Sequence, residues 1–254
     1  MRLLTALLLL CALAACSGPE RREVFRDDFD GTTLDAGRWR HETGPPERWG
    51  TGEIETMAAA NAALDGKGNL AITPLSDGGR WTSGRVRTQR ADFAVPPGGT
   101  LRVEARIALP AVTPADGAGY WPAFWMLGGE TGWPAVGEID IMEAVNGRPA
   151  ITGAMHCGTM PGGPCREPKG LVTPERACPD CFGAFHTYAV EVTERATTWF
   201  LDGRPYHTLE RSLPRGFFVI LNVAIGGGLP GPPNAATVPG RPMLVDWVSV
   251  RTTG

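Results

Sequence analysis

Three acidic residues lie within six positions of the segment GEIDIMEAVNG, residues 137–147. Extended backbone alternates its side chains between two faces, so Glu138 and Asp140 would share one face and Glu143 would point to the other. A β-bulge inserts one extra residue and returns the residues beyond it to the first face. With a bulge at Ile141–Met142, all three carboxylates are predicted to line one face.

Such a group of carboxylates has a specific chemical use. Like charges repel at a few ångströms, so at least one carboxyl is expected to hold a proton near neutral pH. Retaining glycosidases need one ionised carboxylate to attack the anomeric carbon and a protonated one, about 5 to 5.5 Å away, to protonate the departing oxygen. Strand geometry supplies a separation of that order. The alternative, three acids on a solvated strand face, is disfavoured by the apolar Ile139, Ile141 and Met142 between them.

The chain that must position these acids has the length and composition of one large domain. It has 254 residues, of which 43% are hydrophobic, enough to build a core. We expect a signal peptide at 1–15, a short tether at 16–23 and a single catalytic domain at 24–254. The formal net charge of -3 indicates no nucleic acid or other polyanionic partner.

Short strands joined by turns are predicted throughout that domain. The segment TLRVEARIALP alternates apolar with charged residues, as a strand with one buried face does. FFVILNVAIGGG and MLVDWVSVRT form two further strands, and Asp202-Gly203 is expected to form a tight hairpin turn. No long apolar period of 3.6 residues appears. The fold class predicted is all-β, an antiparallel β-sandwich.

The N-terminal segment MRLLTALLLLCALAAC has one arginine and an apolar run too short to span a bilayer, which is typical of a signal peptide. Leu13-Ala14-Ala15-Cys16 resembles a bacterial lipobox, which implies cleavage before Cys16 and lipid on that residue. The alternative is ordinary cleavage nearby, with Cys16 incidental. We expect an exported lipoprotein of the bacterial cell envelope, or a secreted protein, that meets the membrane only through its lipid.

Four cysteines remain after export, namely Cys157, Cys165, Cys178 and Cys181. The CxxC at 178–181 is compatible with zinc, but an oxidising compartment and an even count favour disulfides. Three pairings are possible, and Cys157 with Cys165 and Cys178 with Cys181 is preferred. Both bonds would staple the excursion at 158–183, which is long enough to border a binding site.

The ordered set of segments along the chain resembles the laminarinase-type members of glycoside hydrolase family 16. Glu138, Asp140 and Glu143 match the ExDxxE signature of the bulged strand in that family. The resemblance extends over nearly the whole exported chain, through RDDFDG, GNLAI, SGRVRTQ, YWPAFWMLG, GWPAVGEIDIME, AMHCG, FHTYAVEV, LNVAIGGG and MLVDWVSV. It implies a jelly-roll, concanavalin A-like sandwich with a concave substrate cleft.

The resemblance also implies a role for each acid. Glu138 is expected to be the nucleophile, and Glu143 the acid that then acts as base toward water. Asp140 would hydrogen-bond Glu138 and tune its charge. While Glu138 is anionic it raises the pKa of Glu143, and its esterification removes that repulsion.

A glucan cleft needs broad aromatic surfaces beside hydrogen-bonding groups. The positions of Trp121 and Trp133 resemble the sugar-stacking tryptophans of the family, and Trp125 shares a strand face with Trp121. Core packing is the alternative for each. Four polar residues match further cleft positions of the family: Arg85, His156, Asn222 and Glu53. A structural role is the alternative for His156, and Asn222 must find a partner within its apolar run.

Three positions depart from the family pattern. Thr56 and Met57 stand where an aromatic pair is usual, and Leu229 stands where relatives often have tryptophan. These departures concern the sugar subsites and leave the three acids unchanged.

A structural calcium ion on the convex side is implied by the resemblance, with Asp28, the carbonyl of Gly68 and Asp246 as ligands. Calcium prefers hard oxygen ligands of these kinds. No cofactor is expected for catalysis.

The first functional hypothesis is a retaining endo-β-1,3-glucanase that acts on laminarin-like β-glucan as a monomer. Alternatives are the same acids acting on mixed-linkage glucan or β-galactan, or performing transglycosylation. The non-bulged ExDxE pattern resembles lichenases, so the extra Met142 favours the first hypothesis. A glucan-binding module would lack one of the glutamates, and a structural surface domain would need neither the acids nor the aromatic residues.

Overall fold

Alternating apolar residues build long antiparallel strands in this chain. A computed structural model describes residues 21–254. In β9 (Thr100–Ala108), every second side chain from Leu101 to Ile107 is at most 1% exposed. Residues 1–20 are not described, so the expected signal peptide and Cys16 lie outside the described part.

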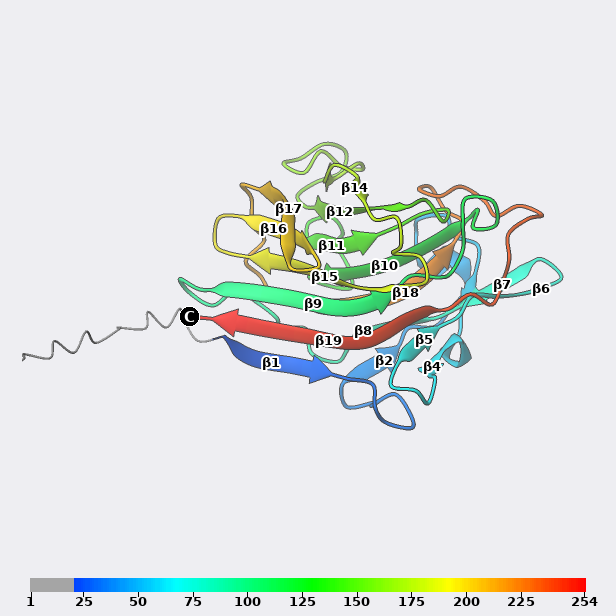
Figure 1. The fold of residues 1–254 in the computed structure, drawn as a ribbon. Coiled ribbons are helices and arrows are strands. Elements are labelled where there is room, and N and C mark those ends of the chain that lie inside the picture. Colours follow the sequence, from blue (N-terminus) through cyan, green and yellow to red (C-terminus); the bar gives the residue numbers. More distant parts are fainter. Residues whose placement is uncertain (1–20) are drawn as a thin grey trace, which may run out of the picture.

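Two antiparallel sheets pack face to face (Figure 1). The first has the order β17-β16-β15-β9-β19-β5-β4, with β1 paired to β19. Its other strands are β1 (Arg22–Asp27), β4 (Ala62–Leu64), β5 (Leu70–Ile72), β15 (Phe185–Val192), β16 (Thr197–Leu201), β17 (Arg204–Leu209) and β19 (Met243–Thr253).

The second sheet has the order β13-β12-β11-β10-β18-β8-β2, with β14 paired to β12. Its strands are β2 (Trp39–His41), β8 (Arg85–Thr88), β10 (Tyr120–Leu127), β11 (Glu138–Glu143), β12 (Ala150–His156), β13 (Leu171–Val172), β14 (Arg176–Ala177) and β18 (Phe218–Ile225). The predicted antiparallel sandwich is confirmed.

Small elements complete the fold. A third sheet joins β3 (Thr56–Met57), β7 (Arg80–Ser83) and β6 (Leu75–Asp77). The helical elements of residues 21–254 are two 3-10 turns, η1 (Pro46–Arg48) and η2 (Ala59–Asn61). In this part of the chain, no helix has the length and apolar character needed to cross a membrane.

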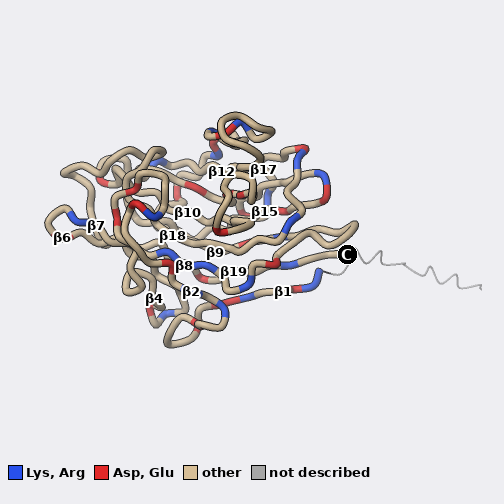
Figure 2. The backbone as a smooth tube through the Cα atoms, turned by 180° about the vertical axis from the view of Figure 1, so that it is seen from behind, with Lys and Arg blue, Asp and Glu red and all other residues tan. Residues whose placement is uncertain are grey.

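The core lies between the two large sheets and includes aromatic residues from both. Trp199 and Tyr188 come from the first sheet, Trp39 and Tyr120 from the second, and each is at most 1% exposed. Every residue of β18 is buried. Acidic and basic residues are interspersed along the strands and loops (Figure 2), as expected for the small net charge.

Several local predictions can be compared directly with the structure. The disulfides are Cys157–Cys165 and Cys178–Cys181, the preferred pairing. Asp202 and Gly203 form the turn between β16 and β17, both with positive φ, as type I′ turns require.

The expected boundary between the tether (16–23) and the domain lies two residues too late. Arg22 and Glu23 belong to β1 and are paired with Thr252 and Arg251 of β19. The backbone ladder, which a charged segment does not reveal, extends the domain toward the N-terminus.

Candidate active site

The register of β11 shifts by one residue where the bulge is predicted. From Asp140 to Glu143, β11 advances three residues while its partner β12 advances two. Ile141 and Met142 both enter the hydrophobic core, so Glu143 returns to the face of Asp140. The predicted bulge is confirmed.

The bulge is fastened from the opposite sheet. The indole N–H of Trp199, in β16, donates a hydrogen bond of 2.8 Å to the carbonyl oxygen of Asp140. A Cβ atom at Gly153 of β12 would overlap that indole nitrogen. Glycine at this position therefore lets the tryptophan reach the strand and donate to the backbone at the bulge.

The surroundings of the three acids raise their pKa values. Burial raises the pKa of Glu138 to about 7; the His156 imidazolium opposes that rise and the charge of Glu143 adds to it. Burial also raises the pKa of Asp140 well above its ordinary value, and the charges of Glu138 and Glu143 add to this effect. Burial raises the pKa of Glu143, opposed by a hydrogen bond from Trp121. The three carboxyls therefore share protons at neutral pH.

His156 lies beside two of the acids, as predicted. It is paired with Glu138 across the β11–β12 ladder. Its Nε2 atom is 3.6 Å from Asp140 Oδ2 and 3.9 Å from Glu138 Oε1. Its Nδ1 atom is 2.8 Å from Glu167 Oε2. One imidazole therefore lies among three carboxyl groups.

The predicted tryptophans all lie close to the site. The indole N–H of Trp121 donates to Glu143 Oε1 at 2.9 Å. Trp133 is 41% exposed, its ring centre is 5.5 Å from that of His156, and it donates a hydrogen bond that lowers the pKa of Glu138. Exposed aromatic surface beside acids offers a stacking platform for the apolar face of a sugar ring.

Trp125 and Asn222 satisfy each other on neighbouring strands. The indole N–H of Trp125 donates to Asn222 Oδ1 at 2.7 Å. Asn222 is 6% exposed and thus finds the partner that its apolar run required. Both residues lie on the open face of the sheet, since Trp125 is paired with Asp140 across the β10–β11 ladder.

Arg85 is held between two aromatic rings next to the acids. Its guanidinium carbon lies 4.9 Å from the ring centre of Trp49 and 4.7 Å from that of Trp125. Its Nε donates to Glu42 at 2.7 Å. The positive charge of Arg85 lowers the pKa of Glu138, so it favours the ionised form of that acid.

Glu53 lies at one end of β18. It forms an isolated bridge with Gly226. A Cβ atom at Gly227 would lie 3.3 Å from the ring of Trp121 and 3.4 Å from the backbone nitrogen of Glu53. Burial raises the pKa of Glu53, and the charge of Arg85 opposes this rise. The glycine therefore leaves room between Glu53 and the Trp121 ring.

Of the three positions that depart from the family pattern, Leu229 lies beside the acids, while Thr56 and Met57 belong to β3 of the third sheet. Leu229 is 53% exposed and lines a hollow together with Glu143 and Thr152. Met57 is buried and Thr56 exposed. The exposed side chain of Leu229 thus lies near Glu143, at a position where relatives often have tryptophan.

Sequence reasoning missed four residues of the site: Glu42, Trp49, Glu167 and Trp199. No local signal marks the first three, because each lies in a segment without regular alternation and acts through a residue distant in the sequence. Trp199 belongs to an alternating strand, where the pattern indicates only burial.

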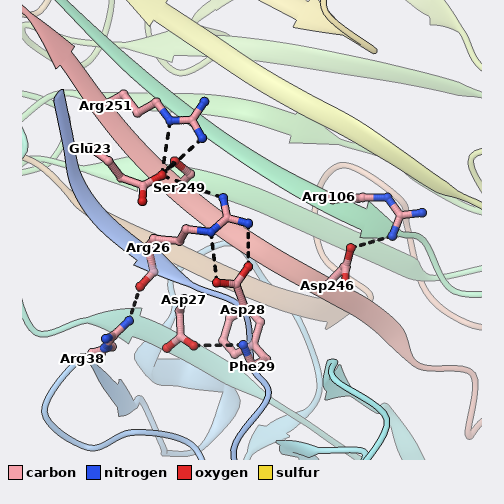
Figure 3. Close-up of polar contacts among 10 residues, drawn as sticks. All are labelled: Glu23, Arg26, Asp27, Asp28, Phe29, Arg38, Arg106, Asp246, Ser249 and Arg251. Atoms are coloured by element: carbon pink, nitrogen blue, oxygen red, sulfur yellow. Dashed lines mark hydrogen bonds and ion pairs between the residues drawn. The ribbon is translucent and has the colours of Figure 1, made fainter. Parts of the chain in front are cut away.

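The predicted calcium ligands are engaged by arginines (Figure 3). Both carboxylate oxygens of Asp28 accept from Arg26, at 2.6 and 3.0 Å. Asp246 accepts from Arg106 at 2.6 Å, and Gly68 lies in the turn between β4 and β5. A calcium ion would have to displace two guanidinium groups, so this donor set does not fit the ion as arranged.

Two other groups in residues 21–254 have the spacing of metal ligands. Cys178 and Cys181 lie near His186, but their sulfurs are joined in a disulfide, which removes the thiolates that bind metal. The second group is Glu138, Asp140 and His156, which is the proton-sharing cluster itself.

Comparison with known proteins gives a family and several relatives. Residues 107–169 match the model of the XgeA-like catalytic GH16 domain. The chain is 30% identical to glucan endo-1,3-beta-glucosidase A1 of Niallia circulans, over 89% of this chain and 37% of that protein. It is 34% identical to glucan endo-1,3-beta-glucosidase of Cryptopygus antarcticus, over 82% of this chain and 81% of that protein. The chain thus spans about a third of the first relative and most of the second.

A solved structure agrees with these relatives. The endo-1,3-beta-glucanase from Streptomyces sioyaensis superposes with a TM-score of 0.87 at 45% sequence identity, covering 96% of this chain and 100% of that one.

The bulge anchor generates one prediction. Trp199→Phe removes the indole N–H that donates to the Asp140 carbonyl, which costs about 1–3 kcal/mol of unfolding free energy, and it frees Glu143 to move. Activity should fall by on the order of tenfold or more in protein that is still folded, since small displacements of reacting groups are costly. Urea unfolding and kcat measured on the same preparation check this.

Trp39→Phe is the matched control for that variant. Trp39 is equally buried and donates a hydrogen bond of 2.8 Å to Asp27, far along the sheet from β11. It should lose stability yet keep kcat. Equal kcat for the two folded variants would contradict the role of Trp199 in holding the bulge.

The arginine pairs at Asp28 and Asp246 generate a second prediction. Adding calcium after EDTA treatment should leave the Tm within about 1 °C, because guanidinium groups already neutralise both carboxylates. A site filled at 100 times its Kd would add about 2.7 kcal/mol, or roughly 5–10 °C in a domain of this size. A rise of that extent in a thermal scan would show that calcium displaces the arginines.

Proposed function

The chain belongs to glycoside hydrolase family 16, and from this membership we propose that it is a retaining endo-hydrolase of β-1,3-glucan. The observation that supports the proposal most strongly is the bulge, which brings Glu138 and Glu143 to one face of β11 with Asp140 between them. Two carboxyl groups on one wall, one ionised and one protonated, are what double displacement requires.

In the first step, the Glu138 carboxylate forms a bond to the anomeric carbon as the glycosidic C–O bond breaks. Glu143 gives its proton to the departing oxygen, and the raised pKa of Glu143 keeps that proton available. Arg85, His156 and Trp133 favour the ionised form of Glu138. The match of Glu138 and Glu143 to the ExDxxE signature assigns attack to the first and proton donation to the second.

In the second step, water attacks the glycosyl-enzyme ester. Glu138 and Glu143 are electrostatically coupled, so esterification of Glu138 removes a negative charge near Glu143 and makes Glu143 easier to ionise. Glu143 then takes the proton of the water, and Glu138 leaves as a carboxylate. Asp140, whose pKa is raised well above its ordinary value, holds a proton and adds no charge beside the nucleophile.

The assignment to β-1,3-glucan rests on the relatives and on the aromatic wall. Endo-1,3-β-glucosidase or endo-1,3-β-glucanase is the name of all three proteins compared above. Trp121, Trp125 and Trp133 lie beside the acids, and broad aromatic surface binds the apolar faces of glucose rings. Leu229, exposed beside Glu143, leaves that part of the face less aromatic than in relatives that have tryptophan there.

The proposal is tested with a panel of polysaccharides. Laminarin should be cleaved to short oligosaccharides faster than mixed-linkage glucan or β-galactan, and the first product seen by NMR should have the β configuration. Glu138→Gln should lower the rate by roughly 10⁴-fold or more, because a nucleophile is lost. Glu143→Gln should slow laminarin far more than an activated aryl glycoside, which needs no proton.

Glu210→Gln, a change to an exposed acid, is the control for loss of one carboxylate and should retain full activity. Inversion of the anomeric centre, or full turnover by Glu138→Gln, would contradict the mechanism. Preference for galactan or mixed-linkage glucan would reassign the substrate and leave the mechanism intact.

For the cellular location we propose a lipid anchor at Cys16, supported by the Leu13-Ala14-Ala15-Cys16 segment. Two changes can be compared in a bacterial host. Cys16→Ser should move the protein from the membrane fraction to the soluble exported fraction, whereas Ser17→Ala should leave it in the membrane. Unchanged fractionation of Cys16→Ser would exclude lipid on this residue.

A further inference from the structure

Glu167 is a buried acid with no part in the mechanism above. Its side chain is fully buried and lies in the excursion at 158–183, two residues beyond the Cys157–Cys165 disulfide. Oε1 accepts a hydrogen bond of 2.9 Å from the backbone N–H of Cys157, and Oε2 lies 2.8 Å from His156 Nδ1. Both oxygens therefore have partners, one of them a group of the active site.

The chemistry of Glu167 indicates which imidazole nitrogen holds the proton. An ionised carboxylate only accepts hydrogen bonds, and in residues 21–254 the one basic side chain within ion-pair distance of Glu167 is His156. Nδ1 must then be the donor. The hydrogen bond that one ring nitrogen of a histidine makes sets which nitrogen holds the proton.

The ring is also fixed in place by its neighbours. A Cβ at Gly170, whose φ is +72°, would lie within 2.6 to 2.9 Å of three imidazole atoms, so this glycine makes room for the ring. Trp133 lies against the ring from the open side. With Nδ1 on Glu167, Nε2 is directed at Asp140 and Glu138.

The charged groups around the imidazole come from three elements. Glu138 and Asp140 of β11 face Nε2, and Glu143 at the end of the same strand feels the charge of the ring. Glu167 faces Nδ1 from the excursion. Arg85 of β8 acts on Glu138 rather than on the ring.

We propose that Glu167 is a positioning residue that keeps Nδ1 of His156 protonated, directs Nε2 at the Glu138–Asp140 pair and provides the counter-charge when the ring is positive. The proposal rests on the proposed function, because it assigns a purpose to charge beside the nucleophile. Glu167 touches no substrate and acts through His156 alone.

The imidazolium charge matters to both catalytic glutamates. It lowers the pKa of Glu138 and that of Glu143. Loss of the Glu167 charge makes the imidazolium less stable, so both glutamates would hold their protons to higher pH. Ionisation of Glu138 governs the acid limb of the rate profile, and protonation of Glu143 governs the alkaline limb. Both limbs should therefore move in the same direction.

Glu167→Gln separates this role from simple packing. The amide has nearly the same shape, but only its oxygen can accept a hydrogen bond. The N–H of Cys157 needs that acceptor, so the amide NH₂ would face His156 Nδ1. The imidazole would then hold its proton on Nε2, with the opposite tautomer and no stabilised positive charge.

The experiment compares pH profiles of kcat/KM on laminarin. Glu167→Gln should shift both limbs to higher pH and lower kcat by roughly tenfold, with KM within about twofold because no sugar contact is lost. In a His156→Gln background, Glu167→Gln should change nothing further. A reduced kcat with unmoved limbs, or an added loss in the His156→Gln background, would overturn the proposal.

Asp202→Asn is the matched control. Asp202 Oδ2 lies 2.8 Å from His186 Nδ1, and its Oδ1 accepts a hydrogen bond of 3.0 Å from the N–H of Thr187. The same pair of contacts thus occurs on the other sheet, at a turn position where asparagine is favoured. This variant should keep the profile of the unmodified protein.

A measurement on the unmodified protein stands apart from activity and from the folding of any variant. The ¹⁵N NMR signals of the four histidines, assigned with His156→Gln, should show Nδ1 of His156 protonated. An Nε2–H tautomer there would overturn the proposal even if laminarin is hydrolysed. If Nδ1 is protonated but laminarin is not cleaved, the result would contradict the proposed function and leave the role of Glu167 in place.

Discussion

One extra residue in β11 is the constraint on which the site depends. Without it, Glu143 would point into the core and Met142 would lie among the acids. The core accepts two successive side chains, Ile141 and Met142, and the indole of Trp199 takes up the carbonyl that the bulge displaces. The position of a catalytic carboxyl is therefore determined by packing between the sheets.

Burial and charge balance then give each acid its protonation state. Desolvation alone raises the pKa of all three, which would leave no nucleophile. Positive charge is supplied next to Glu138 by Arg85, held between Trp49 and Trp125, and by His156. The site is thus a set of buried acids whose raised pKa values are opposed by His156 at both catalytic glutamates, by Arg85 at Glu138 and by Trp121 at Glu143.

The residues that the sequence predicts and those that it misses differ in how far their partners lie along the chain. Alternation is a local rule, so the strands, the hairpin at Asp202-Gly203 and the shared face of Glu138, Asp140 and Glu143 follow from short segments. The tryptophans and Arg85 required family resemblance. Three contacts escaped both, because they join Glu167, Glu42 and Trp199 to partners 11, 43 and 59 positions away.

The distant contacts share a physical logic. A catalytic strand with an irregular ladder has fewer backbone restraints than a regular one, and its acids repel one another. Additional restraints come from outside the ladder of β11. Trp199 reaches across the core, and Glu167 contacts His156 from a position two residues beyond the Cys157–Cys165 disulfide. The excursion at 158–183, expected from its length to border a binding site, contacts the imidazole of His156 through Glu167 and leaves room for the ring at Gly170.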